Sequence, residues 1–377
     1  MKGHKLDLIE FTPPALGPND VFVELQYCGM CHRCAGAPSC PFPRPPRAFF
    51  RSHPKAPRAT RYSLHPVSLA PRSDIHKVED DWKDHVKYPM VPGHEAVGIV
   101  KAVGAAVTKV AVGQAVGFGP QRDSCASCEY CASEDQNLCK GFKGLYDPDF
   151  GGYATSITVN ETFAFPIPEG IPLDVAGPLL CAGVTTFAPL ARYAKKGDRV
   201  GVVGIGGLGH MGLQYAAAMG CATVAITTRA GKEAEARKFG AGEVLVSTDA
   251  AAMKAQAGTF DFILCTASGQ MDVALYLSLL KPRKAFCLVG LPPVAEPLNF
   301  VPFNIVGGEK QIVGSMIGGV AVMKDMLAFS AKHKCFPQCE TIPFAAANEG
   351  FAKILAGEAR YRMVLEIKGF REAKATA

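Results

Sequence analysis

The chain has 377 residues, of which 48% are hydrophobic and 20% charged, a composition typical of a soluble globular protein. This length exceeds that of most single domains and predicts two domains with substantial cores. We find neither a secretory signal nor an apolar run of the ~18 residues that cross a bilayer, so we expect a cytoplasmic protein. The 14 cysteines are then expected to be metal ligands or reduced thiols rather than disulfides.

Most of the formal charge of +6 lies in one segment, residues 33–72. This segment contains eight lysines and arginines and no acidic residue, and without those eight cations the remaining chain carries −2. The basic character is local, so it gives no reason to predict a nucleic-acid partner. Nine prolines and little apolar periodicity predict a disordered insert without a core of its own.

The chain changes its pattern along its length. The N-terminal part is rich in predicted strands and loops, with strands at residues 21–27 and 95–103. From about residue 200, short apolar strands alternate with helices, which predicts an α/β fold with a doubly wound parallel sheet. The predicted strands are 200–203, 222–226, 244–246, 260–264 and 285–289, and the predicted helices are 208–219, 232–239, 250–255 and 271–280.

A glycine-rich loop follows the first strand of this α/β half. Its glycines are those expected of a dinucleotide site: one for the tight turn, one for close approach to a pyrophosphate and one for helix packing. A glycine-rich connection without a ligand is the alternative. The residues assigned to the loop are Gly204, Gly206, Gly207, Leu208 and Gly209.

The end of the second strand predicts the type of cofactor. A site for NAD would carry Asp or Glu there, whereas this chain has Thr227, Thr228 and Arg229, followed by Lys232. Hydroxyls and cations suit a 2′-phosphate, so we predict NADP(H). The alternative is that the two cations only solvate the start of a helix.

Two sets of residues have the chemistry of zinc ligands. The closely spaced Cys125, Cys128, Cys131 and Cys139 can surround one ion tetrahedrally, which predicts a structural zinc rather than an iron–sulfur or redox cluster. The second set is dispersed and would leave one position open, as in a catalytic zinc site; its members are Cys31, His94 with Glu95, and Cys181. Taken singly, each of these could be an ordinary core residue.

Two further cysteine patterns are weaker. Cys28, Cys31, Cys34 and Cys40 have a zinc-ribbon-like spacing, with His53 and His65 nearby, although we prefer a disordered thiol-bearing loop. Cys335 and Cys339 are interpreted as an exposed turn without metal.

In combination, these residues resemble the zinc-containing medium-chain dehydrogenases, in particular the cinnamyl-alcohol-dehydrogenase-like, NADP-dependent aldehyde reductases. The matching segments are YCGMCH at 27–32, VPGHE at 91–95, the four-cysteine lobe, GGYA at 151–154, PLLCAG at 178–183, GIGGLG at 204–209, GSMIGG at 314–319 and YR at 361–362. The resemblance implies a GroES-like catalytic domain at 1–163 with a zinc lobe at 122–142. It also implies a Rossmann domain at 164–304, a return to the first domain at 305–377, and a homodimer.

The resemblance also implies a mechanism. Hydride passes between the nicotinamide of NADP(H) and a carbonyl carbon, while zinc polarises the carbonyl oxygen of an aldehyde substrate. Glu95 matches the carboxylate beside the ligand histidine. Ser73 and His76 match a proton relay, Asp74 matches its orienting carboxylate, and His32 is assigned to the cofactor site.

The chain departs from the family pattern in two places. The 33–72 insert separates Cys31-His32 from Ser73-Asp74-Ile75-His76, which relatives join directly. The chain also starts late, so we expect an early strand to be missing. Two alternatives therefore stay open: a relative that reduces an activated C=C bond, and a catalytically impaired protein that binds zinc and nucleotide. The substrate pocket is expected near Trp82 and Phe118.

Overall fold

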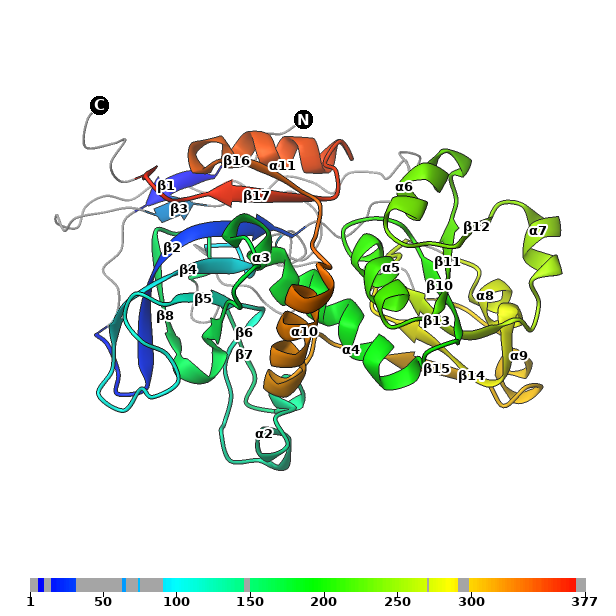
Figure 1. Cartoon of the computed structure of the whole chain (residues 1–377), viewed down its shortest axis with the longest axis horizontal. Coiled ribbons are helices and arrows are strands. Elements are labelled where there is room, and N and C mark those ends of the chain that lie inside the picture. The colour runs from blue at the N-terminus through cyan, green and yellow to red at the C-terminus, as the bar shows by residue number, and fades with distance from the viewer. Residues whose placement is uncertain are drawn as a thin grey trace, which may run out of the picture.

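The computed structural model describes residues 6–9, 15–31, 63–65, 74, 91–145, 150–269, 271–290 and 298–370. Two sheet-based domains lie side by side, with a long helical segment between them (Figure 1). One domain is built from the two ends of the chain, and the other from its middle.

The first domain is organised around β2 (Asp20–Met30), whose alternating Val21, Val23 and Leu25 are buried as the sequence predicts. This strand continues beyond residue 27, where its prediction ends. Residues 27–31 are all buried, so the alternation that predicts the strand stops before the strand does. The sheet order is β16-β17-β2-β4-β5-β9, and β8 also pairs with β2. The other strands are β4 (Ala96–Val103), β5 (Ala115–Phe118), β8 (Ser156–Asn160), β9 (Phe165–Pro166), β16 (Cys339–Pro343) and β17 (Arg362–Glu366).

The second domain is a six-stranded parallel sheet with the order β12-β11-β10-β13-β14-β15. All five predicted strands are confirmed, although β14 begins earlier than predicted. The strands are β10 (Arg199–Val203), β11 (Ala222–Thr227), β12 (Glu243–Val246), β13 (Phe260–Cys265), β14 (Leu280–Leu288) and β15 (Gln311–Gly314). The order of the strands reverses between β10 and β13, where doubly wound sheets bind their ligands.

β15 belongs to the second domain, contrary to prediction. The sequence predicts a return to the first domain at residue 305, but Gly314 of β15 pairs with Leu288 of β14 in the parallel sheet. A short apolar run does not reveal which of two distant sheets it joins. The chain returns to the first domain later, through β16, η5 (Phe344–Ala346), α11 (Ala347–Leu355) and β17.

The helices predicted around the parallel sheet are also confirmed, within a few residues at each end. They are α5 (Gly209–Ala218), α6 (Glu233–Lys238) after η4 (Ala230–Lys232), α7 (Ala250–Ala255) and α8 (Val273–Leu279). Two further helices, α9 (Phe303–Val306) and α10 (Val320–His333), flank β15.

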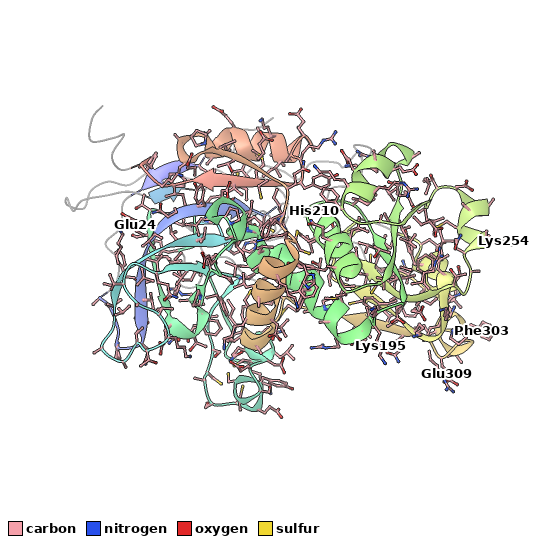
Figure 2. The ribbon with its side chains drawn as sticks, in the orientation of Figure 1. Glu24, Lys195, His210, Lys254, Phe303 and Glu309 are labelled. Atoms are coloured by element: carbon pink, nitrogen blue, oxygen red, sulfur yellow. The ribbon has the colours of Figure 1, made fainter. Side chains whose placement is uncertain are left out.

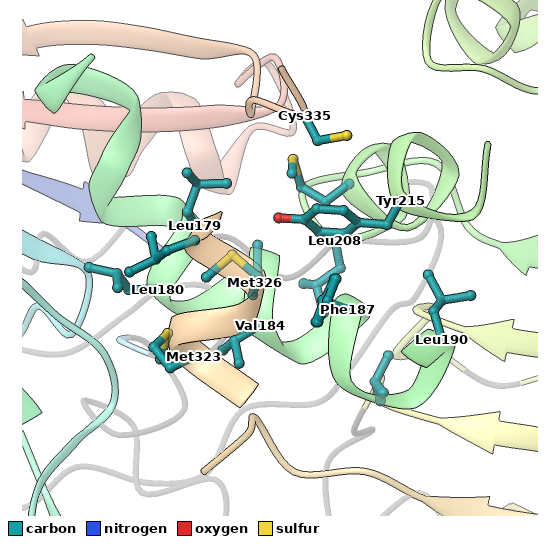
Figure 3. Close-up of a cluster of buried hydrophobic side chains, with 14 of the residues drawn as sticks. Leu179, Leu180, Val184, Phe187, Leu190, Leu208, Tyr215, Met323, Met326 and Cys335 are labelled. Atoms are coloured by element: carbon teal, nitrogen blue, oxygen red, sulfur yellow. The ribbon is translucent and has the colours of Figure 1, made fainter. Parts of the chain in front are cut away.

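A continuous helical run links the domains: α3 (Leu173–Pro178), a π-helical turn η3 (Leu179–Gly183) and α4 (Val184–Tyr193). At 21 residues it is long and apolar enough to cross a membrane, although Asp174 and Arg192 interrupt its apolar residues. However, 83% of its most apolar window is buried inside the protein, which is typical of a core helix. Figure 3 shows its leucines packed against α5 and α10 in the largest core cluster.

The cysteine-rich lobe projects from the first domain and consists of β6 (Gln121–Asp123), α2 (Glu129–Ala132), η1 (Gln136–Leu138) and β7 (Lys143–Gly144) (Figure 1). It is docked on the segment that follows β15. Asn137 Nδ2 donates to the Met316 carbonyl at 2.9 Å, and the Val320 amide donates to Gln136 Oε1 at 3.1 Å. After this lobe, η2 (Glu161–Phe163) leads into β9.

Within the 33–72 insert, the structure describes one short strand. This strand, β3 (Ser63–His65), pairs antiparallel with β1 (Asp7–Ile9), so the insert is not entirely without secondary structure. The start of the described chain is also held to α11, because Asn348 Nδ2 donates to the Leu6 carbonyl at 3.1 Å.

Candidate metal centres and nucleotide site

Four side chains that are far apart in the sequence meet in one buried cluster. Cys31, His94, Glu95 and Cys181 each offer a ligand atom, and these atoms all lie within 4.8 Å of one another. His94 Nε2 lies 3.2 Å from Cys181 Sγ and 3.9 Å from Glu95 Oε1. We call this group the buried cluster.

Strand pairing and a helical turn bring the buried cluster together. Cys31 follows β2 and Glu95 precedes β4, and these neighbouring strands place the Gly29 amide 2.8 Å from the Glu95 carbonyl. Cys181 lies in the π-helical turn, a feature that often marks functional sites. Gly177 allows this helix to approach, since a Cβ there would lie 2.3 Å from the Glu95 carbonyl oxygen.

Asp74 orients the histidine of the buried cluster. Its Oδ1 lies 2.8 Å from His94 Nδ1 and accepts from the Gly93 amide at 3.1 Å, while its Oδ2 accepts from the Cys31 amide at 3.1 Å. The Tyr153 hydroxyl donates to the same carboxylate at 3.3 Å. This arrangement directs Nε2 of His94 toward the sulfur atoms, as in carboxylate–histidine–zinc sites.

The electrostatics of the buried cluster suit a cation. The hydrogen bond from Cys181 lowers the pKa of Cys31, and the same bond together with burial raises the pKa of Cys181. Burial raises the pKa of Glu95 to about 7. Burial opposes protonation of His94, yet the charges of Asp74 and Cys31 raise the pKa of this histidine above its usual value.

The donor set fits zinc. Two sulfurs and one imidazole are a common catalytic zinc set, and neither buried oxygen of Glu95 accepts a hydrogen bond from the described residues. Several acidic groups buried together require positive partners, and a divalent ion would supply one.

Arg362 is a site residue that the sequence motifs do not assign. Its guanidinium is fully buried, and Nη1 lies 3.3 Å from both Cys31 Sγ and Glu95 Oε1. Its Nε donates to the Gly207 carbonyl at 3.3 Å, so one side chain joins the buried cluster to the glycine loop. The available signal was an arginine at the start of the apolar strand Arg362–Glu366.

The four-cysteine lobe also gathers its sulfur atoms, all within 4.8 Å of one another. Cys139 Sγ is 3.4 Å from Cys125 Sγ, and Cys128 Sγ is 3.6 Å from Cys131 Sγ. The Gly141 amide donates to Cys139 Sγ at 3.2 Å, and the amide of Ser127 lowers the pKa of Cys125 to about 6. Four convergent sulfurs fit a closed structural zinc site.

The glycine loop has the geometry that dinucleotide binding requires. Gly204 adopts a φ of +84°, in the left-handed region, directly after β10. A Cβ on Gly209 would lie 1.8 Å from the Gly204 carbonyl oxygen, so only glycine lets α5 start there. Because the loop follows β10, it also lies where the strand order reverses, at the place where doubly wound sheets bind their ligands.

The residues predicted to select the cofactor lie at the end of β11, but they differ in accessibility. Thr228 and Arg229 are exposed, whereas Thr227 is buried and its Oγ1 accepts from the Arg229 amide. Lys232 is already engaged, with its Nζ 2.7 Å from Glu235 Oε2 and 5.1 Å from the ring centre of Tyr361.

Some predicted residues are not brought into a site, and others lie outside the described part of the chain. The roles of the latter stay predictions; they are Ser73, His76, His32, Trp82, Cys34, Cys40 and His53. Cys28 lies in the core of the first domain, while Cys31 belongs to the buried cluster, which disfavours the zinc-ribbon-like alternative. Phe118 is fully buried in the same core.

The expectation of an exposed turn at residues 335–339 is wrong. Cys335 is only 4% exposed and packs in the largest core cluster, and Cys339 begins β16. The turn follows α10 directly and folds back against α5, a tertiary contact that the local sequence does not indicate.

These features define a class: a two-domain, metal-binding protein of the dehydrogenase type. Two family profiles match the chain, "Alcohol dehydrogenase GroES-like domain" at residues 67–169 and "Zinc-binding dehydrogenase" at residues 207–332. The NADP-dependent alcohol dehydrogenase C 1 of Mycolicibacterium smegmatis is 34% identical over 370 residues, covering 96% of this chain and 94% of that protein.

Two solved structures are similar over almost their whole length. A cinnamyl alcohol dehydrogenase from Sorghum bicolor has a TM-score of 0.81 and 32% identity, covering 97% of this chain and 98% of that one. The Helicobacter pylori cinnamyl alcohol dehydrogenase in complex with NADP(H) has a TM-score of 0.78 and 29% identity, covering 98% and 99%. The chain belongs to the zinc-containing medium-chain dehydrogenases, in the cinnamyl-alcohol-dehydrogenase-like branch, which confirms the predicted fold class.

Metal content provides a test of the two clusters. We expect two zinc ions per chain by elemental analysis, falling to one in both Cys128→Ser and His94→Ala, because each variant removes a ligand from a different site. Cys128→Ser should also lower the melting temperature by several degrees. The control Cys221→Ser, whose thiol lies apart from both clusters, should keep two ions. Retention of both ions by Cys128→Ser or His94→Ala would contradict the assignment.

Proposed function

We propose that this protein is a zinc-dependent, NADP(H)-linked alcohol dehydrogenase that acts as an aldehyde reductase. The observation that carries the proposal is the convergence of Cys31, His94 and Cys181, joined through Arg362 to the glycine loop. This arrangement sets a metal site beside a nucleotide site, as hydride transfer to a carbonyl requires.

When bound, zinc would supply a Lewis acid for the carbonyl oxygen, and NADPH would supply the hydride. The protein's own groups prepare that site. Cys31, His94 and Cys181 would hold the metal, while Asp74 keeps the imidazole of His94 in one orientation. Glu95 lies in the same cluster, with its Oε1 3.9 Å from His94 Nε2.

We assign proton transfer to Ser73 and His76. Support comes from Asp74, which follows Ser73 directly and reaches the buried cluster despite the insert that precedes it. A serine adjacent to this carboxylate, with a histidine two residues beyond it, suits a relay from the alcohol oxygen toward solvent. The anchored Asp74 also favours an active reductase over an impaired relative, because the chain after the insert rejoins the site.

One assay separates the proposed activity from its alternatives. NADPH oxidation should be measured with cinnamaldehyde and hexanal on the full chain and on a variant lacking residues 33–72. We expect both forms to convert aldehydes to alcohols, with His94→Ala as the inactive control. Turnover only after the deletion would instead indicate an impaired protein. A saturated aldehyde as the product from cinnamaldehyde would indicate C=C reduction.

Cofactor preference depends on Arg229 in this proposal. Arg229 is exposed beside the end of β11, whereas Lys232 is paired with Glu235, so Arg229 is the cation more available to a 2′-phosphate. Arg229→Ala should weaken NADPH binding about tenfold and leave NADH binding unchanged, as expected for one charge-assisted contact. The control Lys254→Ala removes an exposed cation at the outer end of the domain (Figure 2) and should change neither. Equal losses for both cofactors would contradict the assignment.

We further propose a homodimer formed through the nucleotide domains. Among the described strands, β15 is the last of its sheet, and Val301, Phe303 and Val306 beside it are 63%, 75% and 71% exposed. Exposed apolar groups next to a sheet edge are typical of a protein interface. Phe303→Asp should halve the mass measured by light scattering, whereas Val112→Asp, on the other domain, should not. A monomeric wild-type protein at micromolar concentration would rule out the dimer.

A further inference from the structure

His210 lies in the first turn of α5, directly after the glycine loop, and is fully buried. It is labelled in Figure 2 where the two domains meet. Neither the metal site nor the proposed hydride transfer uses this histidine.

Both ring nitrogens of His210 are hydrogen-bonded, and to different parts of the chain. The backbone amide of Gln338 donates to Nε2 at 3.2 Å, so Nε2 is an acceptor and carries no proton. The proton of the neutral ring is therefore on Nδ1, which donates to the Gly206 carbonyl at 2.9 Å. Burial lowers the pKa of His210 to about 3, so the ring keeps this form at any working pH.

The ring is also fixed by packing. Its centroid lies 4.9 Å from that of Tyr361 and 5.2 Å from that of Phe239. Tyr361 precedes Arg362, whose Nε donates to the Gly207 carbonyl at 3.3 Å. Two consecutive carbonyls of the loop are thus held at the domain boundary. The Gly206 carbonyl accepts from His210 Nδ1 and also from the His210 backbone amide at 3.0 Å, and the Gly207 carbonyl accepts from Arg362.

Because a peptide is planar, a bond that fixes its carbonyl also fixes the direction of its amide. In a trans peptide, the carbonyl of one residue and the amide of the next point in opposite directions. Holding the Gly206 carbonyl toward His210 directs the Gly207 amide to the other side of the loop, and Arg362 does the same for the amide of Leu208. Amides at a helix start bind phosphate groups.

We propose that His210 is a positioning residue that aims the loop amides at the cofactor pyrophosphate and links the loop to the returning segment at Gln338. The inference rests on the proposed NADP(H) site. It assigns His210 to affinity for the pyrophosphate, which NADPH and NADH share, and not to the choice between them.

The test compares two substitutions that keep one bond each with a third that keeps neither. His210→Asn keeps an N–H near the place of Nδ1, and His210→Gln keeps an acceptor near the place of Nε2. His210→Phe keeps the ring packing and loses both bonds. From fluorescence titrations of zinc-loaded protein without substrate, we expect His210→Gln and His210→Phe to bind NADPH and NADH about tenfold more weakly. His210→Asn should stay within about threefold of wild type.

Two controls separate positioning from general damage. Adenosine 2′-monophosphate lacks a pyrophosphate, so its affinity, measured by competition, should be unchanged in all three variants. Gln214→Ala removes another link between α5 and the returning segment, the 3.1 Å bond to the Phe336 carbonyl, and should bind NADPH normally.

The result that overturns the inference is wild-type NADPH affinity in His210→Gln, or an equal loss of affinity for adenosine 2′-monophosphate. A wild-type chain that binds no NADPH would instead contradict the proposed function itself. Because the Asn and Gln variants both replace the ring with a carboxamide and keep different bonds, their comparison remains informative if His210→Phe does not fold.

Discussion

The arrangement of the molecule depends on charge that is buried where the two domains meet. Two thiols, the carboxylates of Glu95 and Asp74, and one imidazole are shielded from water together. Burying unpaired anions costs several kcal/mol each, so such a group requires cations or protons. Among the described residues, Arg362 is the permanent cation in contact with the buried cluster, and zinc would supply the rest. Since Arg362 also holds the glycine loop, metal site and nucleotide site share one electrostatic partner.

Close backbone approach makes this convergence possible. A Cβ on Gly29 would lie 2.1 Å from Glu95 Oε2, and one on Gly177 would lie 2.3 Å from the Glu95 carbonyl oxygen. These two glycines therefore let a strand and a helix approach the same residue closely. The helical run then continues into the core shared with α5 and α10, so packing in that core and geometry at Cys181 are coupled.

Patterns that are local in the sequence predicted the structure well, and non-local contacts did not. Alternation in residues 21–27, the glycine loop and the four-cysteine lobe each depend on neighbours within a few residues, and each forms as predicted. β15 was misassigned because its sheet is chosen by pairing with β14. Arg362 and Cys335 were missed or misread because their burial comes from segments more than a hundred residues away. The buried cluster itself was predictable only because its dispersed residues match a family pattern.

The site can form around the forty residues of the 33–72 insert only if the two ends of the insert stay close together. Closing a longer loop costs only about 0.6 kcal/mol for each doubling of its length, provided that its ends are held together. Here Cys31 and Asp74, 43 positions apart, are joined by a 3.1 Å hydrogen bond from the Cys31 amide to Asp74 Oδ2. Asp74 is in turn fixed by His94, Gly93 and Tyr153, which belong to elements beyond the insert. Four bonds to one buried carboxylate oppose any separation of the ends. The integrity of the catalytic domain around the insert therefore depends on Asp74, whether or not residues 33–72 contribute to substrate binding.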